Sequence, residues 1–190
     1  MNKKQLLIYN ELISKYNFNE KQKHQIKIGV YQNLNVNYYL NPNFNSYQME
    51  EIRLGLLQNL DVTCFAKPEY NENQMVEIKK GLEQNLNVSL YANSEFDWGQ
   101  MREIRKGLIS NIDVFIYAKP EFNDFQMNKI RLGLEKGLDV SICAKPEFDE
   151  LQIIQILEGL ENNVDVTPYL NPGIDWKEMK RIRLKLESNK

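Results

Sequence analysis

The side chains that most often carry out catalysis or bind metal ions are scarce in this chain. His24 is the only histidine, and Cys64 and Cys143 are the only cysteines. A single histidine excludes most metal sites and Ser–His–Asp triads, and neither cysteine has a histidine near it to activate a thiol nucleophile. The glycines occur singly, so no loop has the glycine content that cradles a phosphate. We therefore predict that the protein is not an enzyme and has no catalytic residue, metal site or cofactor.

A row of cations recurs at one fixed interval and is the best candidate for nucleic-acid binding. The row consists of Arg53, Lys79, Arg105, Arg131 and Arg183. Cations about one helix apart could follow a phosphate backbone, but ion pairs with the acidic row Glu69, Glu95, Glu121 and Glu147 explain the pattern as well. The net charge of −2 and the isoelectric point near 5.6 provide no general attraction to phosphate. Binding of nucleic acid is therefore the alternative function.

The whole chain shares the interval of this row. Glycine and isoleucine each recur every 26 residues without an insertion. The glycines are Gly29, Gly55, Gly81, Gly107, Gly133 and Gly159, and the isoleucines are Ile26, Ile52, Ile78, Ile104, Ile130, Ile156 and Ile182. Such a period is the signature of a solenoid, whose units stack because none can bury its apolar face alone. We predict a single domain over 1–190, with an N-terminal capping helix in 1–17, six repeats in 18–173 and a partial seventh repeat in 174–190.

Each repeat carries the start and stop signals of a helix of about 13 residues. In one of them Asp97 is a preferred N-cap, and Gln100 three residues later completes a capping box. Phe96 and Met101 have the spacing of a hydrophobic staple. Apolar residues follow at the positions of one helical face. Asn111 then ends the helix, because asparagine tolerates a left-handed backbone.

A shorter segment, "IDVFIYAKP" in one repeat, links consecutive long helices. Val114, Tyr117 and Ala118 fall at i, i+3 and i+4, so an aspartate-capped short helix or 3-10 turn ending at the proline fits the pattern. An alternating strand, which would give a strand-and-helix horseshoe, is the competing interpretation. We favour the short helix because Asp at the second position and Ala before Lys-Pro suit a capped turn better than a strand. The predicted fold class is all-α, an α-solenoid.

Two columns of the repeat predict packing. A glycine inside a helix costs about 1 kcal/mol relative to alanine, so we expect a neighbouring helix to approach closely at each recurring glycine. The aromatic column Tyr39, Phe65, Tyr91, Tyr117 and Tyr169 could stack bases, but its regular spacing beside alanines favours the core. Cys64 and Cys143 stand in apolar positions three units apart, roughly 30 Å at ~8 to 10 Å per helix. Both are predicted to be buried thiols rather than a disulfide.

The pattern "YAKPEFNxxQMxxIRxGLExGLDVS" resembles a tandem repeat of bacterial and of phage or mobile-element proteins, and it covers the chain from about Phe18 to Glu187. The architecture is similar to the leucine-rich repeat variant, in which a short and a longer helix alternate. This resemblance implies an α-solenoid with a binding role and transfers no catalytic residue. Some small repeat proteins of phage inhibit host defence nucleases, so the resemblance also suggests an inhibitor that occludes a host defence protein.

Function is expected where the repeats differ from one another. Apolar residues replace polar or small ones at Tyr47, Leu54, Trp98, Phe125, Leu132 and Leu151. Phe125 and Leu132 are two helical turns apart, and Leu151 occupies the Phe125 position one repeat later, so these three are predicted to form one exposed patch. We expect this surface to bind another protein. Packing of these residues between repeats, and self-association through the patch, are the alternatives.

The first residues, "MNKKQLLIYN", contain an apolar run of only four residues before Asn10. That run is far shorter than the core of a signal peptide or a membrane span. We therefore expect a cytoplasmic protein that does not bind membranes.

Overall fold

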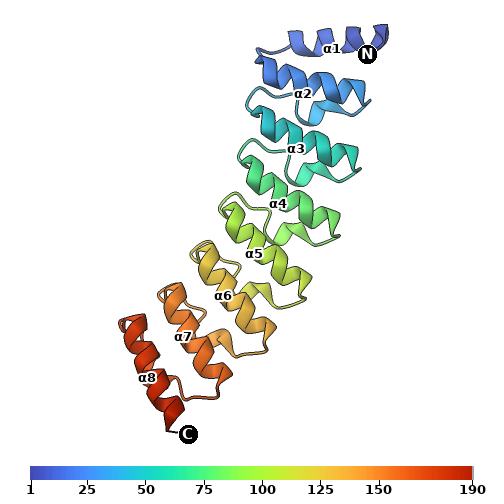
Figure 1. The fold of residues 1–190 in the computed structure, drawn as a ribbon. Coiled ribbons are helices and arrows are strands. Elements are labelled where there is room, and N and C mark those ends of the chain that lie inside the picture. Colours follow the sequence, from blue (N-terminus) through green and yellow to red (C-terminus); the bar gives the residue numbers. More distant parts are fainter. Residues whose placement is uncertain (190) are drawn as a thin grey trace. The chain divides into compact units, whose positions relative to one another are not determined.

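The computed structural model describes residues 1–189, and within that range every regular element is helical (Figure 1). The long helices are α1 (Lys3–Ser14), α2 (Glu20–Tyr31), α3 (Ser46–Leu57), α4 (Glu72–Glu83), α5 (Trp98–Ile109), α6 (Asp124–Glu135), α7 (Glu150–Glu161) and α8 (Trp176–Ser188). The 3-10 helices that follow α2 to α7 are η1 (Val36–Tyr38), η2 (Val62–Cys64), η3 (Val88–Leu90), η4 (Val114–Ile116), η5 (Val140–Ile142) and η6 (Thr167–Tyr169). The predicted all-α solenoid, in which long helices alternate with short helical turns, is confirmed.

The chain divides into two compact units, Met1–Met101 and Arg102–Lys190, and the boundary between them falls inside α5. In the first unit α1, α2, α3 and α4 pack on one another in chain order, and in the second α6, α7 and α8 do the same. Figure 1 shows these long helices side by side within each unit, with the short turns between them. The single domain over 1–190 stays a prediction.

The capping boxes form as predicted at the starts of α3 to α7, but not at α8, where Glu178 pairs with Arg181 instead. The glutamines of these boxes do more than cap. At the start of α6, Asn123 Oδ1 accepts a hydrogen bond from the Gln126 backbone N–H at 2.9 Å, and Gln126 Oε1 accepts one from the Asn123 N–H at 2.8 Å. The amide Nε2 of Gln126 also donates to the backbone oxygens of Pro146 and Phe148 in the next repeat, at 3.1 and 2.6 Å. The equivalent glutamines Gln22, Gln48, Gln74 and Gln152 make the same two bonds. This side chain therefore both starts a helix and ties it to its neighbour.

The ends of the long helices and the short segments also follow the sequence signals. A left-handed residue follows each helix from α2 to α7, namely Asn33, Asn59, Asn85, Asn111, Gly137 and Asn163. In the linking segment, Asp113 accepts a hydrogen bond from the Phe115 N–H at 3.0 Å and caps the 3-10 helix η4. The strand interpretation of this segment is therefore wrong, because a capped turn satisfies its backbone locally.

The core is made of the repeated apolar columns. Met101 and Ile104, like the other methionines and isoleucines of their columns in α3, α4 and α6, have no exposed surface. The aromatic column Tyr39, Phe65, Tyr91, Tyr117 and Tyr169 is fully buried as well, which confirms the predicted core role and removes it as a base-stacking surface. Cys143 is buried, and burial raises its pKa to about 12. Cys64 is only half-buried, contrary to prediction, and both thiols are free.

The recurring glycine has a packing role, but its close neighbour differs from the one expected. A Cβ on Gly107 would lie 1.9 Å from the Tyr117 hydroxyl and 2.8 Å from Val114 Cγ1. Both atoms belong to the short turn that follows the same helix, and not to a neighbouring long helix. The expectation of helix approach is thus corrected at this position. The glycine is needed because the buried aromatic ring folds back over its own helix, where the Tyr117 hydroxyl donates to the Glu103 backbone oxygen at 3.2 Å.

Candidate protein-interaction surface

The predicted row of cations lies inside the protein rather than on its surface. Arg53, Lys79, Arg105, Arg131 and Arg183 are each at most 9% exposed. The oxygen partners lie on the preceding helix, 28 residues earlier: Gln25 for Arg53, Glu51 for Lys79, Glu103 for Arg131 and Gln155 for Arg183. Contact with a phosphate backbone required these cations to be unpaired and on one open face. The structure corrects that assignment, because it places them as internal ties between neighbouring helices.

Glu103 on α5 shows how strong such a tie is. Its carboxylate is 1% exposed and accepts hydrogen bonds from Lys106 at 2.8 Å and from Asn128 and Arg131 at 3.0 Å each. Burial raises the pKa of this carboxyl, but the three hydrogen bonds outweigh burial and hold the pKa at about 2. Glu103 is therefore ionised at neutral pH, and a buried charge pair joins α5 to α6.

This row of ties is interrupted between α6 and α7. Lys129 stands 26 residues after Glu103, at the acceptor position, and Leu157 stands 26 residues after Arg131, at the cation position. Position 129 therefore lacks the oxygen acceptor of the usual pair, and position 157 lacks its cation. Within residues 1–189, the side chain of Lys129 makes no hydrogen bond or ion pair, and it is half-buried.

A third departure from the repeat occurs at the same junction. Cys143 occupies the column that is aromatic at Tyr117, so the ring that covers Gly107 has no counterpart over Gly133. Leu157 from α7 fills that space: its Cδ2 lies 2.8 Å from where a Cβ on Gly133 would be. The small thiol and the inward leucine therefore compensate for each other in volume.

These departures accompany a pocket of about 200 Å³ between α6 and α7. Its lining includes Leu132, Gly133, Leu138, Ile154 and Leu157, together with Lys129. Apolar side chains thus form most of the wall, and one unpaired cation stands among them. At the end of the pocket formed by the last turns of the two helices, Lys136 Nζ pairs with Glu161 Oε2 at 2.6 Å.

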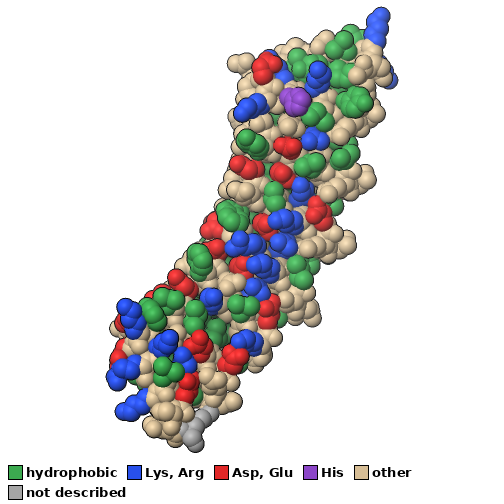
Figure 2. Space-filling model, in the orientation of Figure 1, with side chains coloured by type: hydrophobic (Ala, Val, Ile, Leu, Met, Phe, Trp, Pro, Cys, Tyr) green, Lys and Arg blue, Asp and Glu red, His purple; other side chains and the backbone are tan. Residues whose placement is uncertain are grey.

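Three of the predicted binding residues lie on the same two helices. Phe125 and Leu132 on α6 are 63% and 38% exposed, and Leu151 on α7 is 38% exposed. Leu132 also lines the pocket. In Figure 2 apolar side chains gather among charged ones over α6 and α7. Phe125 is therefore mostly open to solvent, whereas Leu132 and Leu151 are partly covered by their neighbours.

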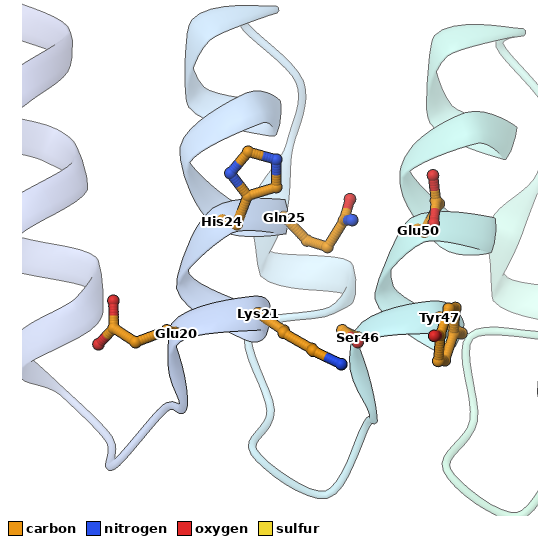
Figure 3. Close-up of a pocket in the computed structure, with 7 residues that line it drawn as sticks. All are labelled: Glu20, Lys21, His24, Gln25, Ser46, Tyr47 and Glu50. Atoms are coloured by element: carbon orange, nitrogen blue, oxygen red, sulfur yellow. The ribbon is translucent and has the colours of Figure 1, made fainter.

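Tyr47 and Leu54 lie on α3 in the first unit, in a more polar setting. Tyr47 is 58% exposed, whereas Leu54 is half-buried. An open pocket of about 440 Å³ lies at the surface over α2 and α3, and its lining includes Tyr47, Lys21, His24 and Glu50 (Figure 3). Lys21 extends from α2 toward the start of α3 in that view. Charged and polar side chains dominate this pocket, so it offers less apolar contact than the one between α6 and α7.

Trp98, the sixth predicted binding residue, is the first residue of α5 and is 44% exposed. It lies in the first unit and already interacts with another residue of the chain. Trp98 is therefore partly committed to the fold.

Comparisons with known proteins give no relative from which a role could be transferred. No protein family, curated protein or solved structure matches this chain. None of the helices in residues 1–189 combines the length and the apolar character that a membrane span requires. In the same range, no group of three or more His, Cys, Asp or Glu side chains is placed to hold a metal ion.

Sequence reasoning missed Lys129 and Leu157 as site residues, although the signal was present. The row of cations has no member at position 157, where the residue is Leu157, and the aromatic column has none at position 143, where the residue is Cys143. The coincidence of these two gaps at one junction became visible only when the fold placed Leu157 against Gly133.

Proposed function

We propose that this protein is a non-catalytic binding module that recognises another protein through the outer face of α6 and α7. One observation carries the proposal. Exposed Phe125, Leu132 and Leu151 lie on the two helices between which the row of internal ties is interrupted and an apolar pocket opens. Protein interfaces draw most of their binding energy from a few residues that meet the partner in well-packed pockets, and clustered exposed apolar side chains mark interaction sites.

The class of partner is inferred from the repeat itself. The resemblance of the repeat to those of phage and mobile-element proteins suggests an inhibitor that occludes a host defence protein. A solenoid suits that role because it presents an extended surface without catalytic groups. The phosphate-binding alternative lacks this kind of support, because its five cations are buried.

Affinity capture from a lysate of the native host tests the proposal. We expect the wild-type chain to retain a specific protein that the double variant Phe125→Glu/Leu132→Glu loses. The matched control is Phe115→Glu, the same substitution at a 69% exposed phenylalanine on η4 in the same unit. Retention by the wild type and by Phe115→Glu, with loss in the double variant, supports the proposal. Equal capture by all three chains contradicts it.

Self-association through the same face is a separate outcome. Light scattering on the purified chain would detect it as a mass above that of the 22.5 kDa monomer. A mass that returns to the monomer value in Phe125→Glu/Leu132→Glu would assign the surface to a second copy of this chain and overturn the proposal of a different partner.

A further inference from the structure

Resting on the proposed function, we propose that the pocket between α6 and α7 accepts one apolar side chain of the partner protein with a carboxylate next to it. Leu132, Ile154 and Leu157 would contact the apolar side chain, and Lys129 would pair with the carboxylate. The argument uses the size of the pocket, the balance of charges around it and the position of Lys129 between exposed apolar residues.

The size of the pocket favours a protein side chain over a free small molecule. Sites for drug-sized ligands occupy about 300 to 1,000 Å³, whereas this pocket has about 200 Å³. A single aliphatic or aromatic side chain suits such a volume. Central anchors of protein interfaces insert into small, desolvated pockets of this kind.

The charges around the pocket leave one cation without a counter-charge. Lys136 is paired with Glu161, and Glu158 accepts a contact from Arg183 Nη2 at 2.6 Å. Of the charged side chains that line this pocket within residues 1–189, Lys129 alone has no ion pair. A carboxylate on the incoming segment would supply the missing counter-charge, and the half-buried setting strengthens such a pair relative to one in open water.

Lys129 is also framed by the exposed anchors. Phe125, Lys129 and Leu132 follow one another at i, i+4 and i+7, so they share one face of α6. Apolar side chains on both sides of the ammonium group would exclude water once a partner is bound, as the rim of an interface does around its anchors. The face thus presents an apolar, a cationic and a second apolar contact in line.

Two small probes test this chemistry without the partner. N-acetyl-leucine carries a leucine side chain beside a carboxylate, and N-acetyl-leucinamide has the same shape without the charge. We would titrate each into the full chain and follow the methyl signals of leucine and isoleucine by NMR. We expect the acid to bind with millimolar affinity, as its few atoms allow, with shifts centred on Leu132, Ile154 and Leu157. The amide should bind about fivefold more weakly, because it lacks the ion pair.

Two variants make the result specific, and the repeat itself indicates that both fold. Lys129→Gln introduces the residue found at the equivalent position in α2 and α7, and it should abolish the preference for the acid. A repeat-restored variant, Lys129→Glu/Cys143→Tyr/Leu157→Arg, rebuilds the side chains of the junction between α5 and α6 and should bind neither probe. Equal binding of acid and amide, shifts outside the pocket, no binding, or binding by the repeat-restored variant would each overturn the inference.

The same variants separate this inference from the proposed function. If Phe125→Glu/Leu132→Glu loses the captured protein while Lys129→Gln and the repeat-restored variant retain it at wild-type affinity, the surface binds a partner but the pocket does not receive its anchor. If all of these chains retain it, the proposed function itself fails.

Discussion

Two neighbouring junctions in the second unit are built from the same repeat and are held together differently. Between α5 and α6, the buried carboxylate of Glu103 pairs with Arg131, and a tyrosine ring covers the helix glycine. Between α6 and α7, Leu157 takes the place of both the cation and the ring, and Lys129 is left without a partner. The regular junction has its charges satisfied internally, whereas the irregular one keeps a cation and an apolar pocket available for contact.

Energetics explain how the chain tolerates the irregular junction. Replacing a buried ion pair by packed apolar groups is often neutral for stability, because it removes the desolvation penalty of two charges. Removing only one member of such a pair is strongly destabilising. At the junction between α6 and α7 both members are changed together, so Lys129 is free to serve binding at little cost to folding.

The largest expected effect comes from removing one charge at the regular junction. Glu103→Ala removes the buried counter-charge of Arg131. It should therefore lower the free energy of unfolding by about 3 to 5 kcal/mol. Lys129→Ala, the matched substitution at the same position one repeat later, should change it by less than about 0.5 kcal/mol. Urea denaturation followed by circular dichroism measures both. Similar losses in the two variants would remove the distinction between the junctions.

Acid should weaken the regular junction in a way that depends on Glu103. Its folded-state pKa is about 2 against an ordinary 4.5, so the stability that it contributes is present above pH 4.5 and is lost as the pH falls toward 2. The loss amounts to about 3 kcal/mol for this group. In Glu103→Gln this part of the acid dependence should disappear. Parallel pH profiles of the free energy of unfolding for both chains would contradict the assignment.

A smaller effect is expected at the two glycines. Gly107→Ala would place a Cβ 1.9 Å from the Tyr117 hydroxyl, so the ring must move, and we expect a destabilisation of about 1 to 3 kcal/mol. At Gly133 the closest atoms are Leu157 Cδ2 and Val140 Cγ1, both at 2.8 Å, and no ring lies over the glycine. Because the end of Leu157 can shift and alanine favours the helix by about 1 kcal/mol, Gly133→Ala should cost less than Gly107→Ala. Thermal unfolding of the two variants gives the comparison, and an equal or larger loss at Gly133 would contradict it.

The smallest expected effect on stability is that of the repeat-restored variant. Its three substitutions supply an ion pair like that of Glu103 with Arg131 and a ring like that of Tyr117, so the unfolding free energy should stay within about 1 kcal/mol of the wild-type value. Denaturant unfolding measures the change. A chain that fails to fold would show that the two junctions differ by more than their side chains.

The sequence predicted the fold because each element is specified locally. The signals that specify them are short-range: capping boxes, the asparagines that end the helices, and the aspartates that cap the short turns. Because the same signals recur in successive repeats, each interpretation could be compared across several of them. The aromatic column was assigned to the core for the same reason. The neighbour of Gly107 was predicted wrongly, because the path of the Tyr117 ring back over its own helix depends on three-dimensional packing, whereas at Gly133 a side chain of the next helix, Leu157, does approach.

The candidate site was predictable only in part. Phe125, Leu132 and Leu151 were found because large apolar residues at outward positions are conspicuous in a regular pattern. Burial of Arg131 and its equivalents was missed, because charged residues are rarely buried unless paired and the partners lie 28 residues earlier on another helix. Lys129 was missed because a lysine on a helix is ordinary until its neighbours are known to be paired.

Titration of the captured partner against the wild-type chain and the repeat-restored variant tests the central claim most directly. The claim is that the irregular junction between α6 and α7 is the binding site. We expect the repeat-restored variant to keep the helical circular dichroism of the wild type and to bind the partner at least about tenfold more weakly, as the loss of a central anchor implies. Equal affinity of the two folded chains would contradict the claim.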